Sequence, residues 1–374
     1  MLKFQSVHSI EDLLPHQNTE SQETKIMYNI EDLTEQARRS GASDIHLVCG
    51  LPPKYRLDGQ LENMAEERLS EKDCDMLCQD LAKDAMYEKL EYTGELDFSR
   101  EIRGIRCRCH VFKQQGKVSA AIRLLSESIP RLDSLGLPPS ALEFTSLHKG
   151  IVLVTGETGS GKSTTLAAML DEINHTRKNH IVTLEDPIEY LHRHDKSIVS
   201  QREINVDTES YVNALRASLR QSPDVILLGE MRDYETIDVA MTAAETGHLV
   251  FSTLHTIGAA NTVDRIIDVF PANQQRQIAV QLSMVLQAVI SQQLVPTVDG
   301  KQVPVFEIMT ITPAIRNMIR DNKVPQIDGI VYSSNKEEMH SMDFGLLNLY
   351  KEGRIIAETA LSYASNPEML KKKL

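Results

Sequence analysis

Residues 151–176 read IVLVTGETGSGKSTTLAAMLDEINHT. The stretch opens with a short apolar run, continues with a glycine-rich loop at 156–163, and closes with apolar residues that recur every three to four positions. This pattern predicts a buried strand, a tight loop and an amphipathic helix, in that order. The loop matches G-x-x-x-x-G-K-[ST], in which glycines let backbone amides converge on phosphate oxygens. The sequence therefore predicts a phosphate-binding loop that holds ATP at a helix N-terminus.

The residues of this loop are the candidates for nucleotide contact. Lys162 is expected to reach the β- and γ-phosphates, and the Ser163 hydroxyl is expected to offer a ligand to Mg²⁺. Composition alone would produce such a match in roughly one chain in a hundred of this length, and the flanking strand and helix make a merely structural turn a weak alternative. The expected nucleotide-binding residues are Gly156, Glu157, Thr158, Gly159, Ser160, Gly161, Lys162, Ser163 and Thr164.

Further apolar runs follow the loop, at 181–184, 225–228 and 249–254, and amphipathic segments separate them. Runs of this kind indicate a mainly parallel sheet that is buried on both faces. Beyond residue 262 the pattern is expected to be mainly helical, and the uncharged stretch 277–298 is expected to form a buried helix. The predicted fold class is therefore α/β, with a helical C-terminal subregion.

A polar residue follows each of these predicted strands. Glu189 comes after the second run, Glu230 after the third and His255 after the fourth. Ligands of parallel sheets bind at the carboxyl ends of the strands, where a carboxylate usually serves Mg²⁺ or water, so Glu230 is expected to hold Mg²⁺ with Ser163. Each residue alone could be a solvated loop residue, but their convergence on one edge argues for function. His248 is a weaker candidate, because it could equally mark the end of a helix.

The first third of the chain predicts a smaller mixed α/β domain. Ser70 and Asp73 are expected to cap a helix that runs toward residue 90, and Asp58-Gly59 is a signal for a tight hairpin. Strands are expected at 45–48, 54–57, 105–112 and 118–125. A stretch with three prolines is then expected to link this domain to the next. The expected boundaries are a loosely held extension at 1–26, an N-terminal domain at 27–125, a linker at 126–140 and an ATPase domain at 141–374.

One predicted strand alternates cysteines with basic residues. Cys107 and Cys109 fall on one face, while Arg106 and Arg108 fall on the other. The cysteine spacings are unlike those of zinc sites, and an odd number of cysteines without a secretion signal favours reduced packing thiols. The five cysteines are Cys49, Cys74, Cys78, Cys107 and Cys109.

The bulk properties exclude several classes of protein. A formal net charge of -13 counts against broad adhesion to nucleic acid, so no nucleic-acid partner is expected. No run approaches 18 uninterrupted apolar residues, and acidic residues interrupt the N-terminus, so neither a transmembrane segment nor a secretion signal is expected. The expected location is the cytoplasm, and a length of 374 residues favours two domains.

Four segments together resemble the secretion-superfamily ATPases, and within them the motors that retract type IV pili. The segments are GETGSGKSTTLAAMLD, TLEDPIEY, LRQSPDVILLGEMRDYETI and AAETGHLVFSTLHT, and ASDIHL, LPPKYRLDG and TPAIRNMIRDNK also fit. The resemblance covers roughly residues 30–321. It implies a PAS-like N-terminal domain, a RecA-like ATPase domain, a homohexameric ring and ATP hydrolysis. The implied partner is the pilus platform protein of the inner membrane, which would place the ring at the inner face of the cytoplasmic membrane.

The same resemblance implies roles for particular residues. Glu189 would be the catalytic base, Glu230 the carboxylate beside Mg²⁺, and His248 and His255 the histidines of the family's His box. Arginines of the N-terminal domain would reach the nucleotide of a neighbouring subunit, and the matching residues here are Arg106 and Arg123. The chain departs from the family pattern at Glu157, Ser222 and Ser252, where proline, an acid and glycine are usual. None of these changes removes a catalytic group.

Three other functions compete with pilus retraction. A related motor for pilus assembly or protein secretion usually has a longer N-terminal region and a four-cysteine zinc element, whereas this chain has no cysteine after Cys109. A DNA-translocating ring shares the core, but the acidic balance and the lack of an aromatic-basic strip count against it. A nucleotide-sensing scaffold would have no need for both Glu189 and Glu230.

Overall fold

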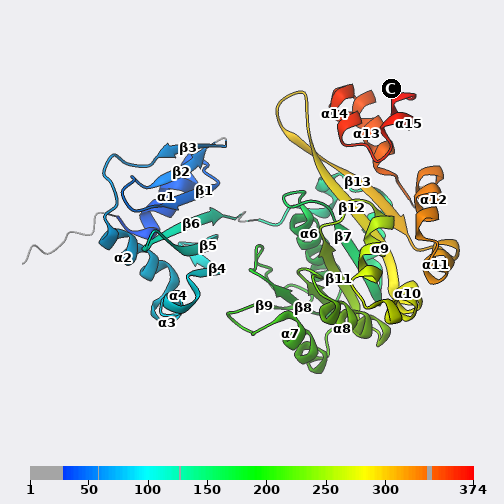
Figure 1. Ribbon diagram of the computed structural model, residues 1–374, viewed down its shortest axis with the longest axis horizontal. Coiled ribbons are helices and arrows are strands. Elements are labelled where there is room, and N and C mark those ends of the chain that lie inside the picture. The colour runs from blue at the N-terminus through cyan, green and yellow to red at the C-terminus, as the bar shows by residue number, and fades with distance from the viewer. Residues whose placement is uncertain (1–27, 58, 126–127, 335–338) are drawn as a thin grey trace, which may run out of the picture.

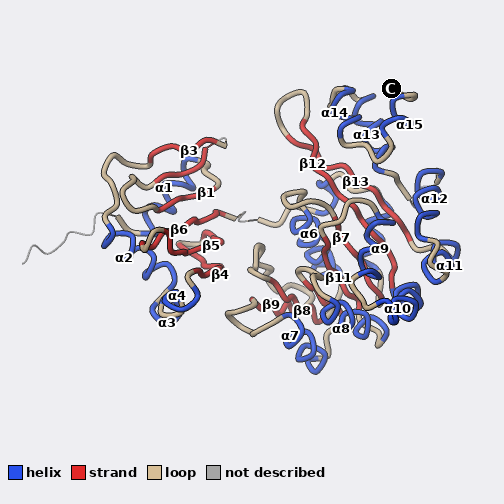
Figure 2. Tube along the Cα trace, viewed as in Figure 1, coloured by secondary structure: helices blue, strands red, loops and turns tan. Residues whose placement is uncertain are grey.

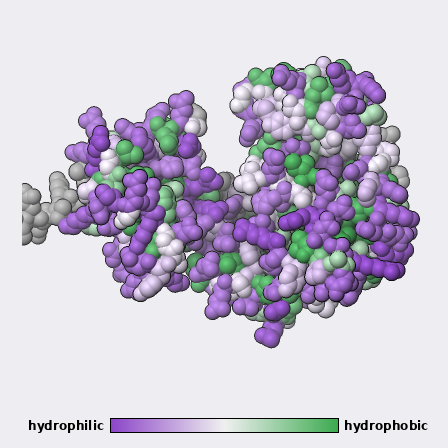
Figure 3. All heavy atoms as spheres, viewed as in Figure 1, coloured by the Kyte–Doolittle hydropathy of each residue, from purple (hydrophilic) through white to green (hydrophobic). Residues whose placement is uncertain are grey.

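The computed structural model describes residues 28–374, except for 58, 126–127 and 335–338. The expected extension at 1–26 and Asp58 of the expected hairpin therefore lie outside the described residues. Figure 1 shows two α/β parts side by side, each built around its own sheet, and Figure 2 shows strands and helices mixed in both. The face drawn in Figure 3 is mostly hydrophilic, with hydrophobic residues scattered over both parts.

The N-terminal part is an antiparallel sheet with helices packed on it. Its strand order is β3-β2-β1-β6-β5-β4, so strands from the two ends of the domain meet where Ile45 on β1 pairs with Ile122 on β6. The four expected strands are present, and β3 and β4 are additional. The strands are β1 Asp44–Leu47, β2 Lys54–Leu57, β3 Gln60–Asn63, β4 Glu95–Ile102, β5 Ile105–Gln114 and β6 Lys117–Leu124; the helices are α1 Ile30–Ser40, α2 Glu71–Ala82, α3 Asp84–Tyr87 and α4 Leu90–Thr93.

The helix expected to run from Ser70 toward residue 90 is shorter than predicted. Its start is confirmed, since the Ser70 hydroxyl accepts the Asp73 N–H and the Asp73 carboxylate accepts the Ser70 N–H. It ends at Ala82 because Lys83 has a φ of 60°, which a right-handed helix cannot include. Two single-turn helices then complete the segment.

The alternation on β5 is confirmed. Cys107 and Cys109 are fully buried in the core of the N-terminal domain, whereas Arg106 and Arg108 lie on the opposite face. Burial in apolar surroundings raises the pKa of the Cys107 thiol to about 12, so this thiol stays protonated and unreactive near neutral pH.

The C-terminal part contains a seven-stranded sheet of order β13-β12-β7-β11-β10-β8-β9. The pairs from β12 to β9 are parallel, and β13 pairs antiparallel to β12. The four predicted apolar runs form its centre, as expected for strands that are buried on both faces. The strands are β7 Gly150–Thr155, β8 His180–Glu185, β9 Ile198–Glu203, β10 Val225–Leu228, β11 Leu249–Leu254, β12 Leu286–Pro296 and β13 Gln302–Thr310.

The expectation of a buried helix over 277–298 is wrong in its second half. The helix α10 Ala272–Val285 ends there, and β12 begins at the next residue and pairs with both β7 and β13. The region beyond residue 262 is therefore less helical than predicted. An uncharged apolar run can be buried either as a helix or between two strands, and periodicity alone does not separate these outcomes.

Helices cover both faces of this sheet. One face packs on α6 Lys162–Thr176, and Leu132, which lies within the expected linker, is buried in that same core. The other face packs on the remaining central helices, and the last three helices pack on the extended ends of β12 and β13. These helices are α7 Tyr211–Ser218, α8 Tyr234–Glu245, α9 Ala259–Asp268, α11 Pro313–Arg320, α12 Ile327–Ser333, α13 Met342–Lys351, α14 Ala357–Ser362 and α15 Pro367–Lys371, and the short α5 Pro139–Leu142 precedes the sheet.

Candidate nucleotide-binding site

The glycine-rich loop lies between β7 and α6, as the sequence predicts. Gly156 has a φ of 141° and Gly161 a φ of 88°, and side chains larger than hydrogen strongly disfavour both conformations. A Cβ atom on Gly156 would lie 2.1 Å from the carbonyl oxygen of Gln292, and one on Gly161 would lie 2.8 Å from its Nε2 atom. The loop therefore folds tightly against β12, and only glycine fits at these two positions.

The loop is built to accept an anion. Lys162 is buried, and its ammonium donates to the carbonyl oxygens of Gly156 at 2.8 Å and Glu157 at 2.7 Å. Burial lowers its pKa, although the carboxylates of Glu230, Glu189 and Glu157 oppose that shift. The buried Ser160 hydroxyl has no hydrogen-bond partner among the described residues and lies in the same loop. A phosphate chain fits these donors and the N-terminus of α6.

Gln292 supports the loop from β12. Its side-chain carbonyl accepts a hydrogen bond from the hydroxyl of Thr165, in the first turn of α6, at 2.7 Å, and Gln292 is buried. Sequence reasoning missed this residue, because its segment was expected to be a helix. A buried glutamine within an apolar run was the available signal, since a buried amide requires partners.

The strand-end residues come together as predicted. Glu189, Glu230 and His255 line one cleft of about 340 Å³ together with Lys162 and Ser163. They follow β8, β10 and β11, whose carboxyl ends lie beside the glycine-rich loop because these strands are parallel to β7. One chain thus brings together an anion-binding loop and two acidic groups.

Glu230 is held by two basic side chains. Its Oε2 atom accepts the Arg232 Nε–H at 2.7 Å, and its Oε1 atom lies 3.0 Å from Nε2 of His255. The pairing raises the pKa of the Arg232 guanidinium. Carboxylate and hydroxyl oxygens are the hard ligands that Mg²⁺ prefers, so Glu230 and Ser163 fit this ion in the presence of nucleotide phosphates.

Two glutamates at the carboxyl end of β8 line the cleft, and they differ in environment: Glu185 is the last residue of the strand and Glu189 follows it. Glu185 accepts hydrogen bonds from Thr183 at 2.6 Å and Gln201 at 3.2 Å, and desolvation raises its pKa to about 7. Glu189 also lines the cleft, and its carboxylate makes no such bond to β8 or β9 among the described residues. Glu185 is therefore held by the sheet edge, whereas Glu189 lacks such bonds, which fits the role of base that stays a prediction for it.

The structure does not bring His248 into this cleft. His248 precedes β11, and its ring Nδ1 atom lies 2.9 Å from the carbonyl oxygen of Ala243 at the end of α8. His255 follows the other end of this six-residue strand, about 23 Å away at 3.3 Å per residue. Within one chain, His248 therefore lies at the end of α8 and outside the cleft, and its expected role as a His-box residue stays a prediction.

The two arginines expected from the N-terminal domain do not line the cleft of their own chain either. Arg106 pairs with Glu203 at 3.1 Å, and Arg123 pairs with Asp44 at 2.9 Å on an exposed surface. Arg108 lines the cleft instead, although no prediction included it as a site residue. Its hydrogen bond to Asp97 raises the pKa of its guanidinium, so it remains a cation. Its position next to Arg106 on the basic face of β5 was the only signal.

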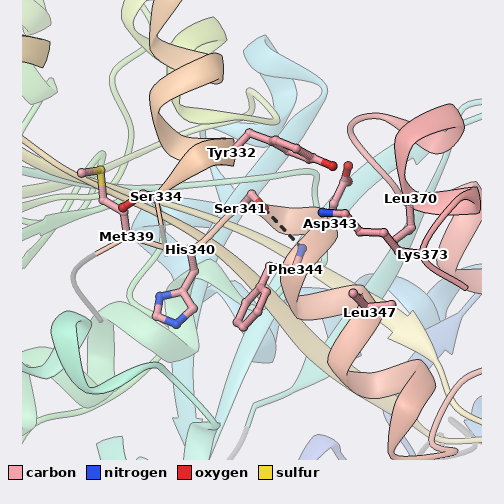
Figure 4. Close-up of a pocket in the computed structure, with 10 residues that line it drawn as sticks. All are labelled: Tyr332, Ser334, Met339, His340, Ser341, Asp343, Phe344, Leu347, Leu370 and Lys373. Carbon is pink, nitrogen blue, oxygen red and sulfur yellow. Dashed lines mark hydrogen bonds between the residues drawn. The ribbon is translucent and has the colours of Figure 1, made fainter. Parts of the chain in front are cut away.

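A separate cavity of about 280 Å³ lies among the C-terminal helices (Figure 4). Phe344 and Leu347 of α13 supply apolar walls, and the Lys373 ammonium lies 4.8 Å from the centre of the Tyr332 ring. Burial lowers the pKa of His340, which also lines it. The cavity shares no residue with the nucleotide cleft, so it is a distinct feature of the fold.

The sequence pattern of the family described as Type II/IV secretion system protein matches residues 19–329. The chain belongs to this family. The Type IV pilus retractation ATPase PilT of Pseudomonas aeruginosa is 44% identical over 341 residues, covering 91% of this chain and 99% of that protein. The crystal structure of the pilus retraction motor PilT with bound ADP matches with a TM-score of 0.87 at 46% identity, covering 92% of this chain and 99% of that one. Type II secretion system ATPase E of Vibrio cholerae serotype O1 is 37% identical over 270 residues, covering 69% of this chain and 52% of that protein.

These similarities confirm the two-domain α/β fold class and the assignment to the nucleotide-binding secretion-superfamily ATPases. They also confirm the likeness to pilus-retraction motors. The roles expected for individual residues stay predictions. Among the described helices, none has the length and apolar character needed to cross a membrane.

Proposed function

We propose that the chain is the ATPase motor of a homohexameric ring that couples ATP hydrolysis to type IV pilus retraction. The observation that carries the proposal is one cleft that combines the glycine-rich loop with Glu189 and Glu230. The ring would act on the pilus platform protein at the cytoplasmic face of the inner membrane. The match extends over 99% of the pilus retraction ATPase, which supports pilus retraction over the other functions considered.

The cleft residues divide the chemistry among them. Lys162 and the backbone amides of the loop bind the phosphates, and Ser163 and Glu230 would hold Mg²⁺. When bound there, the ion would supply positive charge beside the phosphates. Glu189 orients the attacking water and accepts its proton, and His255 keeps the Glu230 carboxylate in place through their 3.0 Å contact.

A motor for pilus assembly or protein secretion is the second candidate. The chain covers only 52% of the type II secretion ATPase, whereas it covers 99% of the pilus retraction ATPase. Identity is also higher to the retraction ATPase, at 44% against 37%, which favours retraction.

Deleting the gene is expected to leave cells with more surface pili than the parent and without twitching motility, because assembly continues when retraction stops. Electron microscopy of the cell surface, with complementation by the natural gene and by a Glu189→Gln variant, measures this. Only the natural gene should restore the parental number of pili. Cells that lose their pili altogether would assign the chain to assembly instead.

Mixing two inactive variants tests the ring and the trans role of Arg123, which is 64% exposed in one chain and thus able to reach a neighbour. Glu189→Gln lacks the base and Arg123→Ala lacks the arginine. Random mixing at one to one restores an intact pair at about a quarter of head-to-tail contacts, so ATPase activity is expected to rise above both parents.

The control for this experiment mixes Glu189→Gln with a chain that carries both substitutions. No subunit in that mixture has the base, so its activity should stay flat. Subunit exchange is followed independently by fluorescence energy transfer between labelled chains. If subunits exchange but the ATPase activity of the test mixture does not rise above both parents, Arg123 does not act on the neighbouring subunit and serves only in its pair with Asp44.

A further inference from the structure

One buried carboxylate joins the two domains. Glu203 is the last residue of β9, and its side chain is only 4% exposed. Its Oε1 atom accepts a hydrogen bond from the backbone N–H of Ser99 on β4 at 2.8 Å, and its Oε2 atom accepts one from Nη2 of Arg106 on β5 at 3.1 Å. The Ser99 hydroxyl donates to the same Oε2 atom and accepts a bond from Arg106. Glu203 is thus bonded to two strands of the N-terminal domain at once.

The same two charged residues hold the backbone next to Glu189. Oε2 of Glu203 accepts the N–H of Ile188 at 3.2 Å, and Nε of Arg106 lies 3.4 Å from the Ile188 carbonyl oxygen, to which it donates. That carbonyl and the N–H of Glu189 belong to one planar peptide group, so fixing the carbonyl restricts the orientation of the group. Contacts from the N-terminal domain therefore reach the residue that adjoins the base.

We propose that Glu203 is a positioning residue which, with Ser99 and Arg106, makes ATP turnover depend on docking of the N-terminal domain. When the domains are docked, these residues hold Ile188 and hence place Glu189 at the cleft. When the N-terminal domain moves away, Glu203 loses Ser99 and Arg106, and the Ile188 carbonyl loses its bond from Arg106, so the backbone before Glu189 is held less firmly. A domain movement in the motor cycle thus switches hydrolysis by changing how firmly Glu189 is held at the cleft. This inference rests on the role of Glu189 proposed above.

The Ser99→Ala variant of the full chain tests this coupling from the N-terminal domain, because it changes no residue of the cleft. The variant loses the hydrogen bond from the Ser99 hydroxyl to the Glu203 carboxylate, which weakens docking of the two domains. We therefore expect hydrogen exchange at the Ile188 and Glu189 amides to become about tenfold faster. We expect kcat for ATP to fall about three- to tenfold, with the Kd for ADP changed less than about twofold. Glu101→Ala, an exposed carboxylate on the same strand, is the matched control and should change none of these values. Unchanged exchange at Ile188 in Ser99→Ala would overturn the proposal.

The Glu203→Gln variant tests the carboxylate itself. In the natural background we expect kcat to fall about tenfold or more. In the Glu189→Gln background the same change should cost less than about twofold in single-turnover rate, because no base remains to be positioned. Equal losses in both backgrounds would mean that Glu203 is merely structural and would contradict the inference. Near-normal turnover of Glu189→Gln alone would instead reject the base assignment, and the exchange experiment would still decide whether docking holds the loop.

Discussion

Lys162→Ala is expected to lose nucleotide binding and, with it, ATP turnover. The Lys162 ammonium is buried in the loop and is surrounded by carbonyl oxygens and by the carboxylates of Glu230, Glu189 and Glu157. Its removal takes away the positive charge that offsets those carboxylates, and the phosphates would then meet a net negative site. The affinity for ADP, measured by isothermal titration calorimetry, should fall by about a hundredfold or more.

The matched control is Lys178→Ala, an exposed lysine just beyond the far end of α6. This change should leave ADP affinity and turnover close to those of the natural chain. Circular dichroism of both variants checks that the fold is kept, because Lys162→Ala also leaves two loop carbonyls without their donor. Folded Lys162→Ala that binds ADP normally would show that the loop is not the nucleotide site.

Glu189→Gln is expected to bind ATP but to hydrolyse it about 10²- to 10⁴-fold more slowly, which is the range that a general base contributes. The amide keeps the size of the side chain and cannot accept the proton of the attacking water. Single-turnover hydrolysis measured beside ATP binding separates these two steps. Glu185→Gln, at the end of β8, is the matched control and should keep turnover within about tenfold of the parent. The opposite outcome for the two variants would transfer the role of base to Glu185.

Glu185→Gln also has an expected effect on stability that depends on pH. Desolvation raises the pKa of Glu185 to about 7 from an ordinary value of 4.5. Between these values the unfolded chain has lost the proton and the folded chain has kept it, so the free energy of unfolding falls as pH rises through this window. Glutamine is neutral at every pH, so the variant avoids the unfavourable burial of a charged carboxylate. It should therefore be more stable than the parent by roughly 1–3 kcal/mol at pH 8 and little changed near pH 4. Urea unfolding at both pH values measures this, and equal stability of the two chains at pH 8 would contradict it.

Local sequence was sufficient for the strand, loop and helix around Lys162. The requirement for glycine at 156 and 161 arises from backbone conformation, and the amphipathic pattern of α6 lies within one segment. The convergence of Glu189, Glu230 and His255 was also predictable, because the carboxyl ends of parallel strands share one edge. The capping box at Ser70 is equally local.

Other features depended on partners far away in the sequence. Whether 286–296 became a helix or a strand was decided by β7 and β13, which supply backbone hydrogen bonds on both sides of β12. The fit of Gly156 against Gln292 follows from that pairing. By contrast, the apolar run 249–254 already placed His248 before one strand and His255 after it, and the structure confirms that separation.

The sequence by itself determined the nucleotide chemistry, because phosphate binding is encoded in contiguous backbone conformations and in residue types at strand ends. Only the tertiary structure decided how the N-terminal domain contacts the ATPase domain beside the nucleotide cleft. Ser99 and Glu203 are 104 residues apart, and Arg106 and Ile188 are 82 apart, yet they share one buried set of hydrogen bonds. A buried carboxylate needs hydrogen-bond donors, and the fold can supply them from residues that are distant in the sequence. The periodicity of apolar residues along the chain does not indicate which residues these donors are.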